Sequence, residues 1–133
     1  MKVRVYCASP WRRAKMWRTL EFPSIKVVST WHDDLSLAEA EQDCDPVACR
    51  AAWARDFKQI MSADALLVYA EAKDRPNGTL VEVGYALSHD MPVHIVGNFE
   101  WGTWRFDPLV QQHNTLIGAV EDISGVPHDP SKT

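Results

Sequence analysis

Three things are scarce in this sequence: cysteine, long apolar runs and an excess of positive charge. Its three cysteines are Cys7, Cys44 and Cys49, and an odd, scattered set favours reduced thiols over a disulfide framework. No apolar run is long enough to cross a bilayer. The residues after Met1 enter a strand pattern at once, so we see no targeting segment. These features together predict a cytoplasmic protein with no membrane partner.

The charge balance is mildly acidic, with a formal net charge of -4 and a pI of about 5.7. A protein that binds a nucleic-acid backbone needs a basic face, so we expect no nucleic-acid polymer as a partner. One or two local arginines are enough for a small phosphate-bearing ligand. The net charge is therefore compatible with a nucleotide as the ligand.

The chain has 133 residues, of which 46% are hydrophobic and 24% are charged. That length fits one domain that can bury a core of its own. We expect this domain to span residues 1–126 and to be followed by a flexible tail from Pro127 to Thr133.

Short β-branched or apolar runs alternate with longer helical patterns. The runs predict strands at Val3–Cys7, Lys26–Thr30, Ala65–Ala70, Pro92–Val96 and Leu116–Ala119. The segments between them predict helices over Trp11–Leu20, Pro46–Ser62 and Thr79–Ser88, and a loop over His32–Asp45. A fully apolar run such as 65–70 is typical of a central parallel strand covered on both faces. The alternation predicts an α/β fold, a flavodoxin- or Rossmann-like three-layer sandwich with a mostly parallel sheet of about five strands.

In sheets of this kind a ligand binds beyond the carboxyl ends of the strands. Three segments are expected at that edge, namely Cys7–Arg13, Tyr69–Gly78 and Gly97–Phe106. We therefore expect the functional residues to lie in and around these segments.

Glu82 is the only charged residue of the helix predicted over Thr79–Ser88. That helix is apolar on nearly every side, which is typical of a buried helix. A buried lone carboxylate is costly unless it is paired or functional. The helix dipole favours its ionised form, whereas desolvation favours its neutral form. Glu82 is therefore either a functional carboxylate or half of a structural ion pair with an arginine.

Five stretches carry a family pattern: Val5–Arg12, Asp56–Tyr69, Gly78–Leu87, Pro92–Val96 and Phe106–Val110. The most specific is the Gly-x3-Glu-x-Gly-x-Ala block that begins at Gly78. Together they resemble the nucleoside 2-deoxyribosyltransferase family, in particular its small phage and bacterial members. The resemblance extends to the related nucleoside 5′-monophosphate N-glycosidases.

The resemblance implies roles for four residues. The glutamate of the block is the family's nucleophile, which places that role on Glu82. Asp56 matches an aspartate that holds or protonates the base, and Asp74 is the candidate for a second aspartate in the loop before the glutamate. Tyr6 resembles a tyrosine near the sugar. Family members complete each site from a neighbouring subunit, which implies a homo-oligomer, and Asn98 is a stand-in for the asparagine supplied in this way.

The related hydrolases bind phosphate near the first loop, which is basic in this chain. A helix start with Ser9 and Arg12 could hold an anion; alternatively, Arg12 and Arg13 are solvated helix charges. We assign substrate binding to Tyr6, Ser9, Trp11, Arg12, Gly78 and Asn98.

The remaining candidates have mostly structural interpretations. Trp101 and Trp104 lie on the ligand edge, where they would stack on a base or fill a subunit interface. The His32–Asp34 run has no partner pair at metal spacing, and Cys44 and Cys49 form no zinc or redox motif, so we expect no metal and no cofactor. Core or helix packing is expected for Trp11, Trp17, Trp31 and Trp53.

Cleavage of an N-glycosidic bond fits these residues. The reaction passes through an oxocarbenium-like state that a carboxylate can stabilise or capture, and the departing base must be protonated. The leading hypothesis is cleavage of a (deoxy)nucleoside or its 5′-monophosphate, with transfer of the deoxyribosyl group to another base or to water. Two alternatives stay open: a non-catalytic nucleotide-binding or sensing module, and a hydrolase of another N-glycosidic bond, such as that of NAD.

Overall fold

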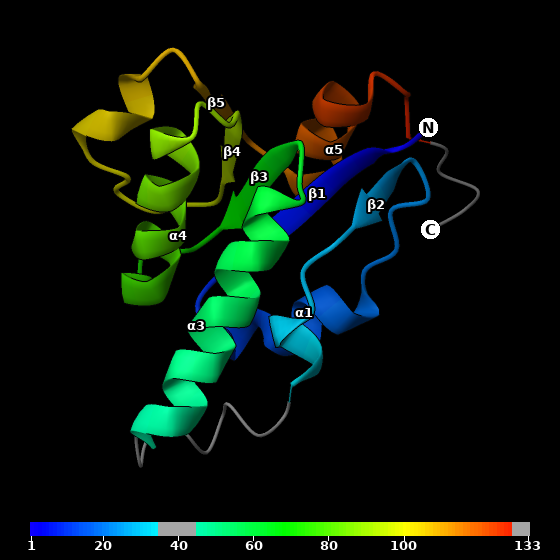
Figure 1. Ribbon diagram of the computed structural model, residues 1–133. Coiled ribbons are helices and arrows are strands. Elements are labelled where there is room, and N and C mark those ends of the chain that lie inside the picture. Colours follow the sequence, from blue (N-terminus) through cyan, green and yellow to red (C-terminus); the bar gives the residue numbers. More distant parts are fainter. Residues whose placement is uncertain (35–44, 129–133) are drawn as a thin grey trace.

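The computed structural model describes residues 1–34 and 45–128. The strands are β1 (Val3–Ala8), β2 (Ile25–Val27), β3 (Ala65–Tyr69), β4 (Val93–Val96) and β5 (Val110–His113). They form one sheet in the order β2-β1-β3-β4-β5, and every neighbouring pair is parallel (Figure 1). The predicted α/β class and parallel five-stranded sheet are confirmed, in a flavodoxin-like arrangement.

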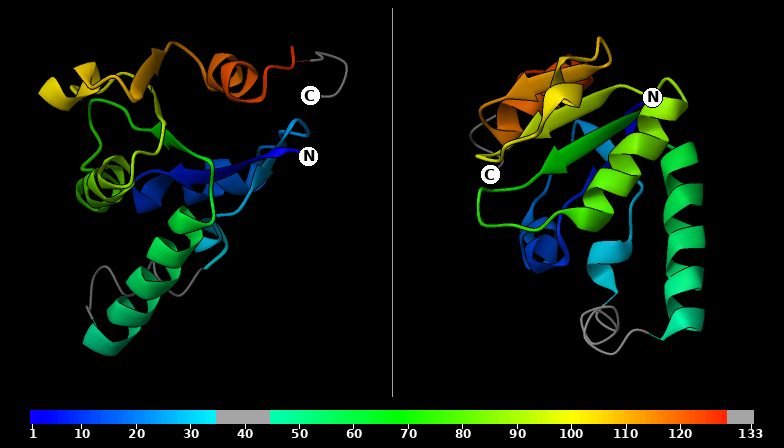
Figure 2. Two further views of the ribbon diagram at one scale, coloured as in Figure 1. Left: turned by 45° about the horizontal axis from the view of Figure 1, so that its top comes forward. Right: turned by 90° about the vertical axis from the view of Figure 1, so that its left-hand side faces the viewer.

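Helices cover both faces of this sheet (Figure 2). The α-helices are α1 (Ala14–Thr19), α3 (Pro46–Met61), α4 (Asn77–Ser88) and α5 (Leu116–Ser124), and three short 3-10 helices are η1 (Trp11–Arg13), η2 (Trp31–Asp33) and η3 (Thr103–Phe106). Helices α3 and α4 lie beside each other on one face, and α5 lies on the other. Within residues 1–34 and 45–128, no helix combines the length and apolar character needed to span a membrane.

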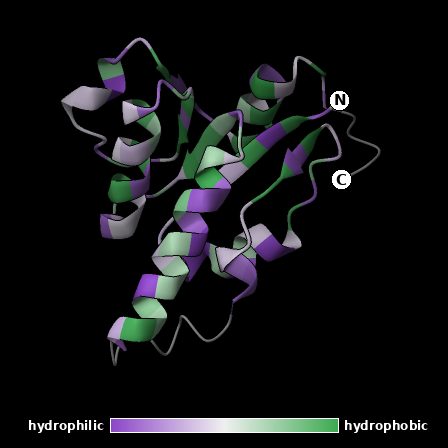
Figure 3. Ribbon diagram, viewed as in Figure 1, coloured by the Kyte–Doolittle hydropathy of each residue, from purple (hydrophilic) through white to green (hydrophobic). Residues whose placement is uncertain are grey.

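The core is centred on β3, as its apolar sequence predicts. Leu66 and Leu67 point to opposite faces of the sheet, and neither has any exposed surface. Figure 3 shows β3 largely in the hydrophobic colour, whereas hydrophilic residues recur along α3. Only Asp56 and Ile60 are buried on α3. This helix therefore packs against the other elements along a narrow stripe.

The strand predicted over 116–119 is wrong, because this segment belongs to α5. The Thr115 side chain caps the helix by accepting a hydrogen bond of 3.0 Å from the Gly118 amide. Gly125 ends the helix with a φ of 71°, in the left-handed region. The fifth strand is Val110–His113, in which three polar residues follow one buried valine, so this edge strand shows no apolar run.

The expectation that the helix around Glu82 is buried on all sides is also wrong. Leu80 and Val81 are 38% and 51% exposed, because only one side of α4 packs on the sheet and α3. The helix begins at Asn77, two residues earlier than predicted. Its buried residues are Thr79, Glu82, Val83 and Ala86.

Two other predictions fall partly outside the described residues. The loop predicted over His32–Asp45 includes η2 and is not described at 35–44, which include Cys44. The predicted tail is described only at Pro127 and His128. The first predicted helix is divided into η1 and α1, and the second strand ends at Val27.

Candidate functional site

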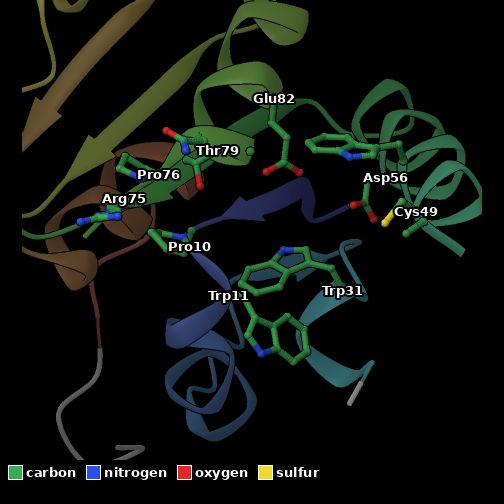
Figure 4. A pocket seen from close by; sticks show the side chains of 14 residues that line it. Pro10, Trp11, Trp31, Cys49, Asp56, Arg75, Pro76, Thr79 and Glu82 are labelled. Atoms are coloured by element: carbon green, nitrogen blue, oxygen red, sulfur yellow. The ribbon is translucent and has the colours of Figure 1, made fainter. Parts of the chain in front are cut away.

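A cavity of about 360 Å3 opens beyond the carboxyl end of β1, between α3 and the start of α4 (Figure 4). This is the sheet edge at which parallel α/β folds bind ligands. The segment after β1 and the 3-10 helix η2 supply part of the wall, and α3, the end of the loop before α4 and the first turns of α4 supply the rest. The lining residues are Ser9, Pro10, Trp11, Trp31, Cys49, Ala52, Trp53, Asp56, Arg75, Pro76, Asn77, Gly78, Thr79 and Glu82.

Glu82 projects from α4 into this cavity and is 5% exposed. Its Oε2 accepts a hydrogen bond from the Tyr6 hydroxyl. Burial raises the pKa of Glu82 to about 8, the hydrogen bond from Tyr6 opposes that rise, and the nearby Asp56 adds to it. Among the described residues no basic side chain forms an ion pair with Glu82. The geometry therefore disfavours the structural ion pair that the sequence left open.

Tyr6, on strand β1, donates the hydrogen bond that Glu82 accepts. It lies on β1 and has no exposed surface, and its neighbour in the sheet is Leu66. Burial and the adjacent Glu82 raise the pKa of Tyr6 far above its ordinary value. The phenol therefore keeps its proton and acts as a hydrogen-bond donor to the carboxyl group.

Asp56 lies across the cavity on α3, and its side chain is 12% exposed. Burial raises the pKa of Asp56, although the paired Arg55 opposes that rise. Arg55 lies 3.1 Å from Asp56 and also binds Asp34 at 2.9 Å. Two carboxyl groups with raised pKa values thus line one cavity, which is the arrangement that acid–base chemistry uses.

Tryptophans form the apolar walls of the cavity. Trp11, Trp31 and Trp53 all line it, and the rings of Trp11 and Trp31 lie 6.1 Å apart at 58°. Trp11 was also predicted to bind substrate, but Trp31 and Trp53 were expected only as packing groups, so their place in the cavity is a correction. The sequence did hold one signal, because Trp53 precedes Asp56 by three residues and therefore shares its helix face.

The two tryptophans expected at the ligand edge lie elsewhere. Trp101 and Trp104 contact each other edge-on at 5.9 Å, and neither lines the cavity. Trp101 is 5% exposed, so a single chain already buries it. The flat walls available to a base are therefore those of the first loop, η2 and α3.

The start of α4 supplies polar groups that the sequence analysis missed. The Thr79 hydroxyl is buried and has no hydrogen-bond partner among the described residues. Arg75 lines the cavity just before the helix, and no carboxylate of residues 1–34 and 45–128 lies in ion-pair range of it. The first amides of a helix lack partners within that helix and attract anions. This end of the cavity is therefore suited to an anionic group.

Four predicted site residues lie outside the cavity lining: Tyr6, which reaches Glu82 from β1, and Arg12, Asp74 and Asn98. Asp74 is buried and binds Arg13 at 3.1 Å and Arg12 at 3.4 Å. Burial alone would raise the pKa of Asp74, but the Glu71 amide and Arg13 lower it below its ordinary value. An ionised, paired aspartate is poorly suited to donate a proton. Asn98 is exposed and also lies outside the lining.

Of the other predicted binding residues, Ser9, Trp11 and Gly78 do line the cavity. The Ser9 hydroxyl donates to the Tyr69 carbonyl and accepts from the Trp17 indole, which fixes the loop after β1. The Arg12 side chain is 52% exposed and forms an ion pair with Asp74.

Comparison with known proteins agrees with the fold. No family model matches the chain, and no curated protein matches its sequence. Its structure is similar to that of the 2-deoxyribosyltransferase from the psychrotolerant bacterium Bacillus psychrosaccharolyticus, with a TM-score of 0.66 and 17% sequence identity. The match covers 97% of this chain and 94% of that one. The chain is thus a flavodoxin-like α/β protein that shares the fold of a 2-deoxyribosyltransferase.

Proposed function

We propose that this protein cleaves the N-glycosidic bond of a (deoxy)nucleoside or its 5′-monophosphate and passes the deoxyribosyl group to another base or to water. The observation that carries the proposal is Glu82, which is buried, bonded to Tyr6 and placed opposite Asp56 in one cavity. The fold shared with a 2-deoxyribosyltransferase supports the same reaction class.

The two carboxyl groups fit a reaction that uses one proton. As the C1′–N bond breaks, its electron pair goes to the base, which must gain a proton to leave. The raised pKa of Glu82, about 8, keeps a proton in the resting cavity. Transfer of that proton to Asp56, across the cavity, leaves Glu82 ionised, and Asp56 passes the proton to the departing base as the general acid. The Glu82 carboxylate then bonds to C1′, as the nucleophile of a retaining glycosidase does.

The second half of the reaction reverses these steps. An incoming base or water attacks C1′, the ester bond to Glu82 breaks, and the attacking group gives up one proton. That proton returns to the carboxyl pair. The same site therefore performs transfer or hydrolysis, depending on which acceptor occupies the cavity.

The cavity walls suggest how the substrate lies. In the proposed pose the base packs against the tryptophan walls, because flat apolar rings stack on aromatic faces. The sugar lies at Glu82, and a 5′-phosphate lies at the start of α4, near Arg75 and Thr79. This pose moves the phosphate site from the predicted Arg12, which lies outside the cavity lining, to the start of α4.

One observation favours a second candidate, a nucleotide-binding module without turnover. With a pKa of about 8, Glu82 is mostly neutral at neutral pH and offers little negative charge in the resting state. A cavity that only binds a nucleotide needs no ionised carboxylate.

A base-release assay separates the candidates. Chromatography would follow free base from deoxynucleosides, ribonucleosides, their 5′-monophosphates and NAD, each with and without a second base as acceptor. We expect release from a nucleoside or its monophosphate, and exchange when an acceptor is present. Binding of these ligands without release of any base would favour the non-catalytic module. Release of the base from NAD alone would favour a hydrolase of the N-glycosidic bond of NAD.

A homo-oligomer also stays part of the proposal. The resemblance to a family with shared sites motivates it, but the second expected reason, two exposed tryptophans, does not hold because Trp101 is buried in the single chain. Phe106 and Val81 are 71% and 51% exposed and give a subunit contact apolar surface to cover. Light scattering at micromolar concentration should give a mass of at least two chains, and a monomer would contradict the expectation.

A further inference from the structure

A second group of polar side chains lies on the face of the sheet opposite Glu82. His94 on β4 is paired with Gln111 of β5, so His113, two residues further on, points to the same face. Asp122 reaches this pair from α5, the helix that covers this face. The three residues come from three different elements, which explains why no metal spacing is visible in the sequence.

The ligand atoms of this cluster are close to the arrangement of a metal site. Nδ1 of His94 lies 2.9 Å from Nε2 of His113, and Oδ2 of Asp122 lies 3.8 Å from each of them. Zinc bonds to nitrogen and oxygen are about 2.0–2.2 Å long, which puts tetrahedral ligand atoms roughly 3.3–3.5 Å apart. Shifts of about half an ångström would therefore bring the three atoms to equal distances from one ion.

The chemical state of the imidazoles also suits ligation. His94 is 6% exposed, and burial lowers its pKa, as it does that of His113. Burial therefore favours the neutral form of both rings, which is the form that binds metals. One ring nitrogen now donates to the other, so binding requires the donor ring to move its proton to its second nitrogen. No proton is lost in that tautomer change.

We propose that His94, His113 and Asp122 form a binding site for a divalent transition metal, with zinc as the first choice. Two imidazoles and one carboxylate favour zinc and similar ions, whereas magnesium and calcium prefer oxygen ligands throughout. The Asp122 side chain is 50% exposed, which leaves room for solvent at a fourth position. A bound ion ties the edge strand β5 and helix α5 to β4. The site is separate from the cavity, so it does not depend on the proposed reaction.

The test uses tag-free protein that has been treated with a chelator and titrated calorimetrically with zinc alone. We expect one saturable site per chain and a melting temperature that rises by a few degrees with zinc and falls back when the chelator is restored, because an ion that binds the folded state stabilises it. Cobalt alone should give the visible absorption of a low-symmetry nitrogen and oxygen site. Magnesium should give neither effect.

Variants decide whether this cluster is the site. Asp122→Asn and His113→Ala should each weaken zinc binding at least tenfold, whereas His89→Ala, at the exposed histidine that follows α4, should bind as the parent does. If His113→Ala fails to fold, the test rests on Asp122→Asn alone, because the Asp122 side chain is half-exposed. The proposal is overturned if the parent shows no saturable binding, or if zinc affinity is unchanged in Asp122→Asn.

Discussion

The Tyr6 hydroxyl donates a hydrogen bond to Oε2 of Glu82, which joins the first strand to helix α4 across 76 residues of sequence. Both groups are buried, and this bond opposes the effect of burial on the carboxyl group. The protonation of Glu82 is therefore set by two neighbours, Tyr6 and Asp56, and by the exclusion of water. Each of these influences can be tested.

Replacement of Glu82 by glutamine should preserve the fold and remove base release. Glutamine keeps the shape and an oxygen that accepts from Tyr6, but it cannot ionise and is a poor nucleophile. Loss of such a group typically costs roughly a hundredfold to a thousandfold in rate. Base release and thermal melting should be measured on the same preparations, with Glu100→Gln as a control at an exposed glutamate. Near-parental turnover by Glu82→Gln would refute the mechanism.

The pH profile of kcat/KM should be bell-shaped, because the active form holds one proton on the carboxyl pair. This parameter reports the free enzyme, so activity should fall as the pH rises through about 8, where Glu82 ionises. Tyr6→Phe removes a hydrogen bond that lowers the pKa of Glu82, so the falling limb should move to higher pH. Tyr85→Phe, on the same helix as Glu82, is the matched control and should leave the limb in place. A profile that keeps rising above pH 8 would mean that Glu82 donates no proton.

Stability should depend on pH through the same group. The ordinary pKa of a glutamate is 4.5, and that of folded Glu82 is about 8. Between these values the unfolded chain releases the proton and the folded chain keeps it, so the contribution of Glu82 to stability is full below pH 4.5 and is lost as the pH rises through 8. The Glu82→Gln side chain does not ionise, so the variant does not lose this stability as the pH rises. The melting temperature of the variant minus that of the parent should therefore increase from pH 5 to pH 8, and a constant difference would contradict the raised pKa.

Phosphate preference should depend on Arg75 more than on Arg12. Arg75 lines the cavity, whereas Arg12 lies 3.4 Å from Asp74 and outside the lining. Arg75→Ala should weaken binding of a 5′-monophosphate roughly tenfold or more and leave the nucleoside nearly unaffected, because a hydrogen bond to a charged group is lost. Calorimetry on both ligands, with Arg12→Ala alongside, measures the difference. A larger loss in Arg12→Ala would restore the assignment made from the sequence.

The sequence by itself determined the class of fold and singled out one candidate carboxylate. The apolar run at 65–70 required a strand covered on both faces, and the alternation of strands with helices required parallel connections. Glu82 stood out because it is the single charge in an apolar helix. These signals are local, since each is carried by a few neighbouring residues.

Only the tertiary structure decided which residues meet. Tyr6, Asp56 and Glu82 come together because β1, α3 and α4 converge beyond one edge of the sheet, and the same packing excludes Arg12 and Asn98 from the cavity. The pairing of Asp74 with Arg13 and the approach of His94 to His113 are likewise contacts between elements distant in sequence. The pKa of a carboxyl group depends on the water and charge around it in three dimensions. For this reason the sequence could identify Glu82 as a candidate but could not predict its protonation state.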